Sequence, residues 1–235
     1  MNKISKSKTL SLNREGEILI IKTLDLLETQ YHNEKNPPKL LHEEPLDGLV
    51  LTVLSQNTND KNRDLAFRNL KNNYQDYQQI INSGSEKLEK IIKPAGLGTT
   101  KSIRIINILK KIHDDFGEYS LKKLADFSHD EAWNYLINME GVGVKTVACV
   151  LLFDLKIKAF PVDTHVSRIT RRLGIVPEKT HADEISLLFE KIVPDSRCLG
   201  GHVNMIAHGR AICHSRNPEC KNCVLNEFCK YKFMI

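Results

Sequence analysis

Four cysteines near the C-terminus place the strongest constraint on how this chain folds. All four lie within one short segment, at Cys213, Cys220, Cys223 and Cys229. Because short loops have a small closure entropy, four thiolates at this spacing can surround one metal centre. Disulfides are less favoured, since the N-terminus lacks the apolar region of a secretory signal and we expect a reducing compartment. The spacing accepts either a zinc ion or an iron-sulfur cluster. Cys149 and Cys198 are interpreted as buried, inert thiols.

The composition is that of a globular protein. The chain has 235 residues, of which 41% are hydrophobic and 27% are charged. This length allows one domain or two small ones, and no apolar run reaches the ~18 residues of a membrane-spanning helix. The net charge of +5 is mild and compatible with a nucleic-acid partner, without demonstrating one. We therefore expect a cytoplasmic monomer without a membrane partner, associated with the nucleoid if the source is prokaryotic.

Apolar residues at helical spacing predict an all-α fold. The expected helices cover residues 12–31, 46–55, 60–73, 74–82, 85–93, a segment after Gly98, 129–139, 146–155, 165–173, 182–192 and 199–213. Pro45 suits a first helical turn, the polar cluster at 56–60 suits the end of one helix and the cap of the next, and Gly174 suits a helix end. One candidate strand, 156–162, has no convincing partner and is interpreted as a connection.

A glycine turn precedes an apolar helix in the middle of the chain. Gly141, Val142 and Gly143 form a tight turn, and the helix after it presents backbone amides without partners. Such amides, with the positive end of the helix dipole, can bind a phosphate group, although similar turns also serve purely structural hairpins. Lys145 lies in the first turn of this helix. It is either a solvated surface charge or a chemically used amine.

Asp163 follows in the segment Pro161-Val162-Asp163-Thr164-His165. Its local sequence favours an N-cap for the helix that begins near His165. An aspartate in that position can still turn an oxygen toward a nearby site.

The order of these motifs resembles that of one family. Gly-Val-Gly-x-Lys-Thr, then Val-Asp-Thr-His, then Cys-x6-Cys-x2-Cys-x5-Cys is similar to the endonuclease III branch of the helix-hairpin-helix DNA glycosylases, from about Leu46 to the C-terminus. The resemblance implies a 4Fe-4S cluster at the four cysteines and a hairpin that grips the DNA backbone. It also implies that Lys145 is the nucleophile and Asp163 the catalytic carboxylate. A basic loop residue beside the cluster, Lys221, is expected to contact phosphate, and Arg168, Arg171 and Arg172 are weaker candidates for the same role.

The resemblance also implies a domain organisation and further DNA contacts. Residues 38–157 would form a six-helix barrel with the helix-hairpin-helix motif, and residues 1–37 with 158–235 the cluster domain, with a DNA-binding cleft between them. Gln56 resembles the family's residue that fills the gap left by an extruded base, and Leu97 the residue that wedges into the duplex. For Gln56 taken alone, a helix-ending polar residue is the simpler interpretation. Gly98 stands where the family often has an aromatic residue, which leaves the lesion contacts open.

The sequence thus predicts a bifunctional DNA glycosylase and AP lyase of base excision repair. Its expected partner is double-stranded DNA with a damaged base or an abasic site, and the resemblance implies oxidised pyrimidines as the damaged bases. Two alternatives stay open. One is a monofunctional glycosylase for mismatched adenine or thymine, whose members usually lack a lysine at position 145. The other is a non-enzymatic, cluster-bearing DNA-binding module.

Overall fold

The structure, a computed structural model, describes residues 10–37 and 42–233. All regular elements in these residues are helical, and no strand occurs among them, so the prediction of an all-α fold is confirmed. Within the same ranges, no helix combines the length and the apolar character that crossing a membrane requires.

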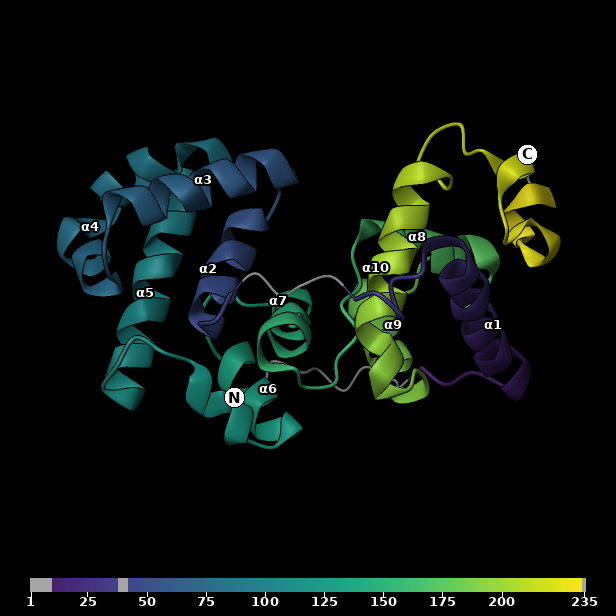
Figure 1. Ribbon diagram of the computed structural model, residues 1–235, viewed down its shortest axis with the longest axis horizontal. Coiled ribbons are helices and arrows are strands. Elements are labelled where there is room, and N and C mark those ends of the chain that lie inside the picture. Colours follow the sequence, from purple (N-terminus) through teal and green to yellow (C-terminus); the bar gives the residue numbers. More distant parts are fainter. Residues whose placement is uncertain (1–9, 38–41, 234–235) are drawn as a thin grey trace. The chain divides into compact units, whose positions relative to one another are not determined.

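The chain divides into two compact units, Leu40–Ile157 and the two chain ends, Met1–Lys39 with Lys158–Ile235. Figure 1 shows the helices of both units. The first unit, here called the central unit, contains α2 (Pro45–Ser55), α3 (Asp60–Asn73), α4 (Tyr77–Ile92), α5 (Gly98–Phe116), α6 (His129–Ile137) and α7 (Val144–Cys149). The second unit, the terminal unit, contains α1 (Arg14–Tyr31), α8 (Thr164–Leu173), α9 (Ala182–Ile192) and α10 (Asp195–Ala211).

Helix boundaries follow the polar and glycine signals in the sequence. Pro45 occupies the first turn of α2, and the Asn59 side chain caps α3 by accepting a hydrogen bond from the Asn62 amide at 2.9 Å. Gly174 ends α8 in the left-handed conformation, with φ at 73°. These three predictions are confirmed. They could be made from the sequence because a cap depends on neighbours within a few residues.

The predicted break within α4 is confirmed. Gly84 adopts φ 75° and ψ 166°, which are not helical, so α4 contains two helices joined at a kink, as expected for 74–82 and 85–93. Two predicted helix starts were wrong. The helix expected at 146–155 begins at Val144 and passes after Cys149 into a π-helical turn, Val150–Leu155, and the helix expected at 199–213 begins at Asp195.

The core of the central unit forms around α2 and α5. α2 contacts α3, α5 and α7, and its buried apolar side chains are Leu46, Leu49, Val50, Val53 and Leu54. The predicted inner face of α5 is buried as well, with Ile105, Ile108, Leu109 and Ile112 at most 2% exposed. Burial of each such side chain stabilises the folded state by ~1.5–3 kcal/mol. This packing fixes the C-terminal end of α2 and the N-terminal end of α5, where Gln56 and Leu97 stand.

A carboxyl group is packed against α2 in the same unit. Asp154, in the π-helical turn, fills the space beside Gly48, since a Cβ on that glycine would lie 2.1 Å from the Asp154 carboxyl atoms. Burial, and to a smaller extent the charge of Asp47, raises the pKa of Asp154 from 3.8 to about 7. The folded state therefore retains a proton that the unfolded chain releases between about pH 4 and 7. The free energy of unfolding decreases as pH rises through this range.

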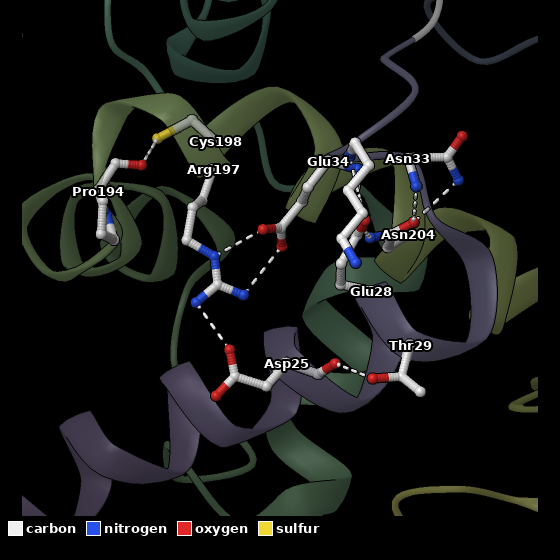
Figure 2. A network of polar contacts seen from close by, with 10 residues as sticks. Asp25, Glu28, Thr29, Asn33, Glu34, Pro194, Arg197, Cys198 and Asn204 are labelled. Atoms are coloured by element: carbon white, nitrogen blue, oxygen red, sulfur yellow. Dashed lines mark hydrogen bonds and ion pairs between the residues drawn. The ribbon is translucent and has the colours of Figure 1, made fainter.

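The terminal unit joins the first helix of the chain to the last. α1 packs against α10, and a polar network extends this contact at the C-terminal end of α1 (Figure 2). The guanidinium of Arg197 donates two hydrogen bonds to Glu34, at 2.7 and 3.0 Å, and also pairs with Asp25 at 2.9 Å. The network attaches the N-terminal helix to the helix that leads to Cys213.

The network contains one nearly buried carboxylate, Glu28. It accepts hydrogen bonds from the amides of Glu34 and Lys35, at 2.7 and 3.1 Å, and from the side chain of Asn204 at 2.9 Å. Burial by itself would raise the pKa of Glu28, but these bonds outweigh it and lower the pKa. The charged form is therefore stabilised in the fold.

The raised pKa of Asp154 leads to a stability prediction. We expect Asp154→Asn to increase the free energy of unfolding at about pH 8 by on the order of 2 kcal/mol, because the variant has no buried carboxylate to ionise. At about pH 4 the variant and the parent protein should differ little. Urea unfolding at both pH values measures the difference, with the exposed Asp114→Asn as control. An equal change at both pH values would contradict this account.

Candidate functional site

The predicted glycine turn joins α6 to α7. Gly141 has φ at 77°, and a Cβ at this position would lie 1.9 Å from Nε of Arg104, so both its conformation and its surroundings require glycine. Val142 anchors the turn because its side chain is only 6% exposed. Gly143 is exposed and immediately precedes α7 without a side-chain cap. The first amides of α7 therefore point out of the helix without intrahelical partners, as an anion site requires.

Lys145 is exposed in the first turn of α7. The next three residues, Thr146, Val147 and Ala148, are buried and fix the helix in the core. The amine is therefore presented to solvent from a rigid element, directly after the turn whose amides are available to a phosphate. The structure brings the predicted nucleophile and the predicted backbone grip together within the central unit.

Gln56 lies against this hairpin. It is the C-terminal cap residue of α2, and its Nε2 donates hydrogen bonds to the carbonyl of Gly141 at 3.1 Å and to Oγ1 of Thr146 at 3.4 Å. Its Oε1 accepts a hydrogen bond from Arg104 at 2.8 Å. Gln56 is therefore more than a helix-ending polar residue, because its side chain connects the end of α2 to the turn and to α7.

Leu97 is an exposed residue with unusual backbone geometry. It precedes α5 in the left-handed conformation, with φ at 49°, and its side chain is 57% exposed. Both properties are unfavourable for leucine, since the left-handed region is sterically costly and the apolar side chain faces water. Gly98 follows as the first residue of α5, and a Cβ there would lie 2.9 Å from the Glu89 side chain.

Asp163 is the N-cap residue of α8, as its local sequence predicted. Its Oδ1 accepts hydrogen bonds from the amides of His165, at 2.9 Å, and Val166, at 2.8 Å. Both bonds use the same carboxylate oxygen, so the second oxygen of Asp163 can still face another group. Lys145 belongs to the central unit and Asp163 to the terminal unit.

The arginines of α8 have partners within the protein that their local sequence did not show. Each donates to a carbonyl of the protein: Arg168 to Cys213 at 2.7 Å, Arg171 to Thr180 at 2.6 Å and Arg172 to His214 at 2.6 Å. Two of the three therefore hold the loop that begins at the first clustered cysteine. The sequence suggested phosphate contacts or solvated charge because these carbonyl partners lie far away along the chain.

The four clustered cysteines line a single hollow, together with Arg172, Ile212, Pro218 and Tyr231. All four are half-buried. Burial, together with the neighbouring Cys213, Cys229 and Cys220, raises the pKa of the Cys223 thiol to about 11, so the thiols are close enough to interact. In residues 10–37 and 42–233, no three His, Cys, Asp or Glu side chains are grouped as one metal ion would require. The four thiols nevertheless line the same hollow.

The structure also gives the burial of the two other cysteines and of Lys221. Cys198 is buried, as predicted, whereas Cys149 is only half-buried. Lys221 is exposed in the short helical turn Cys220–Asn222, beside the hollow.

Comparison with known proteins decides the family. The HhH-GPD superfamily of base excision DNA repair proteins matches residues 50–195. The chain belongs to this superfamily. Among HhH-GPD relatives, endonuclease III of Sulfolobus acidocaldarius is 35% identical over 187 residues, which cover 78% of this chain and 80% of that protein. Endonuclease III of Thermotoga maritima is 34% identical over 190 residues, covering 80% and 84%. A relative from Arabidopsis thaliana is 35% identical, and the match spans 60% of its length.

Solved structures show the same relationship. A trapped endonuclease III–DNA covalent intermediate matches with a TM-score of 0.80 and 26% identity, covering 96% of this chain and all of that one. A non-covalent endonuclease III–DNA complex matches with a TM-score of 0.78 and 27% identity, covering 95% and 99%. The predicted resemblance is confirmed, and this HhH-GPD protein is a DNA glycosylase of the endonuclease III type.

Sequence reasoning missed two residues beside the site, Lys101 and Arg104 of α5. A signal was present, since Lys101 shares the apolar face of Ile105 and Ile108, where a lysine is unexpected. Nothing in the sequence indicated the contacts of Arg104, which join segments far apart in the chain.

Proposed function

We propose that this protein is a bifunctional DNA glycosylase and AP lyase that removes damaged bases, in the first place oxidised pyrimidines, from duplex DNA. The observation that carries the proposal is the exposed amine of Lys145, which α7 presents directly after the Gly141–Gly143 turn. A monofunctional glycosylase needs no such amine, and a module that only binds DNA does not need it either.

Lys145 is the proposed nucleophile. Its amine is neutral when it attacks C1′ of the damaged nucleotide, so that a C–N bond forms while the base leaves with the electron pair of the glycosidic bond and takes up a proton from solvent. Nζ then passes a proton to the ring oxygen O4′, and the sugar ring opens to give a protonated Schiff base between C1′ and Nζ. Loss of a proton from C2′ expels the 3′ phosphate, which is the β-elimination that cuts the strand. Water releases the sugar from Lys145.

Asp163 is the proposed catalytic carboxylate. Its Oδ1 is held by the two amides that begin α8, which fixes the position of the side chain. In the complex with DNA, its other oxygen would stabilise positive charge that develops on the sugar or help to activate the amine. The N-cap and the catalytic role are therefore compatible.

The remaining proposed contacts are of two kinds: contacts to the DNA backbone, and side chains that fill the space of a flipped base. The amides around Gly141, Val142 and Gly143 bind a backbone phosphate, and Lys221 contributes a second contact. A base within a duplex must be flipped out before its C1′ can be attacked, at a cost of a few kcal/mol. Gln56 and Leu97 occupy the space that the base leaves. The absence of an aromatic residue at Gly98 suggests that lesion contacts there come mainly from backbone.

The four cysteines are proposed as the ligands of a 4Fe-4S cluster. The donor set fits, because four thiolates around one hollow are what such a cluster binds, and Arg172 donates to Sγ of Cys213 at 3.3 Å. The role assigned to the cluster is structural, since the proposed reaction transfers no electrons to or from the protein. It would hold the loop that carries Lys221.

Borohydride trapping tests the lyase assignment. With duplex DNA that contains one abasic site, reduction of the Schiff base is expected to give a covalent protein–DNA complex, measured on a denaturing gel. Lys145→Gln should give none, because it has no amine to form the bond. Lys110→Gln, which removes an exposed lysine of α5, should trap as the parent protein does. Failure of the parent protein to trap would refute the lyase activity.

Two substitutions of Asp163 separate its cap from its chemistry. Asp163→Asn keeps a side-chain oxygen for the α8 amides, so we expect a stability change below ~1 kcal/mol but at least ~100-fold slower excision. Asp163→Ala removes the cap as well and should cost ~1 kcal/mol of stability in addition. Single-turnover excision and urea unfolding measure the two effects. Full activity in Asp163→Asn would leave Asp163 as a cap alone.

The cluster has a spectroscopic signature. Protein purified without oxygen should show broad absorption in the blue part of the visible spectrum, with iron and sulfide bound, because thiolate-ligated iron absorbs there. Cys220→Ser should lose the absorption and the iron. Cys198→Ser, which changes a buried cysteine outside the set, should keep both. A colourless protein loaded with zinc would refute the assignment.

A further inference from the structure

A buried lysine connects the two loops that carry the proposed gap-filling residues. The Lys101 side chain lies inside the central unit, and the residue is 1% exposed. Its Nζ donates hydrogen bonds to the carbonyls of Leu54 at 2.7 Å and Ala95 at 2.8 Å. Only Ser55 separates Leu54 from Gln56, and only Gly96 separates Ala95 from Leu97. One ammonium group therefore ties the backbone before Gln56 to the backbone before Leu97.

Arg104, on the next turn of α5, extends this connection to the hairpin. Its Nη1 donates to Oε1 of Gln56 at 2.8 Å. Its Nε and Cδ also occupy the space that a Cβ of Gly141 would need, so the side chain lies directly against the turn. A further contact from α5 follows, as Nδ2 of Asn107 approaches Oε2 of Glu140 at 3.4 Å.

Three segments thus meet on the first turns of α5. They are distant in sequence, and each contains residues to which we assign a DNA contact: Gln56, Leu97 and the Gly141–Gly143 turn. Leu97 needs such support most, because its left-handed backbone and exposed side chain are unfavourable by themselves. The bond from Lys101 to the Ala95 carbonyl ties the backbone that precedes Leu97 to α5, the helix that follows it.

We propose that Lys101 and Arg104 are positioning residues, which hold Gln56, Leu97 and the hairpin in one fixed register so that both side chains enter the duplex together. This positioning role rests on the proposed function, because it presupposes that Gln56, Leu97 and the hairpin contact DNA. Filling the gap of a flipped base requires side chains placed to within ~0.5 Å. Without the ammonium, two buried carbonyls would lack partners, and the loops would shift until water satisfied them.

The test compares Lys101→Met and Arg104→Met with Lys110→Met, which removes an exposed lysine of the same helix. Methionine keeps the length of the side chain and removes the donors. The first probe is a duplex with a tetrahydrofuran abasic analogue opposite 2-aminopurine. The parent protein and Lys110→Met should raise 2-aminopurine fluorescence on binding, because gap-filling disturbs the orphan base. Lys101→Met and Arg104→Met should bind at saturation with less than ~half of that rise, since displaced side chains fill the gap poorly.

The second probe separates positioning from chemistry. Excision of thymine glycol from duplex DNA should slow by ~10-fold or more in Lys101→Met and Arg104→Met, because small displacements cost large factors in rate. Cleavage of single-stranded DNA with one abasic site, which needs no gap to be filled, should change by less than ~2-fold under the same argument. Arg104→Lys, which retains a donor for Gln56, should recover part of the duplex activity.

Two results would overturn the proposal. One is an equal loss on duplex and single-stranded DNA, which indicates general damage to the fold; the other is a full fluorescence response in both variants. If Lys101→Met does not fold by circular dichroism, Arg104→Met and Arg104→Lys decide the outcome. Absence of borohydride trapping in the parent protein would refute the lyase assignment, yet the fluorescence measurement on the uncleavable analogue would still test the positioning.

Discussion

The bond between the Lys101 ammonium and two backbone carbonyls is the interaction on which the geometry of the central unit depends. An ammonium group inside a protein is tolerated only when it is paired, and burial lowers the pKa of Lys101. Its acceptors are carbonyls near helix ends, where no intrahelical partner exists. One side chain therefore satisfies two helix ends and fixes their separation. The arrangement restrains the loops after those ends, although loops of this kind are usually mobile.

Helix α8 links the proposed chemistry to the cysteine loop within the terminal unit. Its N-terminus is capped by Asp163, and along its length Arg168 and Arg172 donate to the carbonyls of Cys213 and His214. A helix moves as a rigid body, so whatever fixes the cysteine loop also fixes the carboxylate at the other end. A cluster at the cysteines, as proposed, would thereby have a physical connection to the catalytic carboxylate without any electron transfer. The two arginines matter here because they hold the cysteine loop against α8.

Local signals in the sequence predicted most helices, their caps, the glycine turn and the grouped cysteines. Asn59 and Gly174 act on neighbours within a turn, so their effect is visible in a short window of sequence. The errors came from contacts across the chain. The carbonyl partner of Arg172 was missed because His214 lies in a different segment, and nothing near Asp154 showed that Gly48 would leave room for its carboxyl group. A buried lysine among isoleucines was visible in the sequence, but its two acceptors were not.

Two costly features of the central unit occur in segments that adjoin the proposed site in the chain. Leu97 has a strained backbone and an exposed apolar side chain, and the π-helical turn that continues α7 buries the carboxyl group of Asp154. A sequence selected for stability alone would replace each of them, since proteins tend to break local rules where function requires it. The strain at Leu97 agrees with its proposed role, because an exposed leucine held by a fixed backbone can wedge between bases without first being ordered. The π-helical turn packs the end of the helix that carries Lys145 against α2. Lys145, Gln56 and the glycine turn therefore share one rigid support.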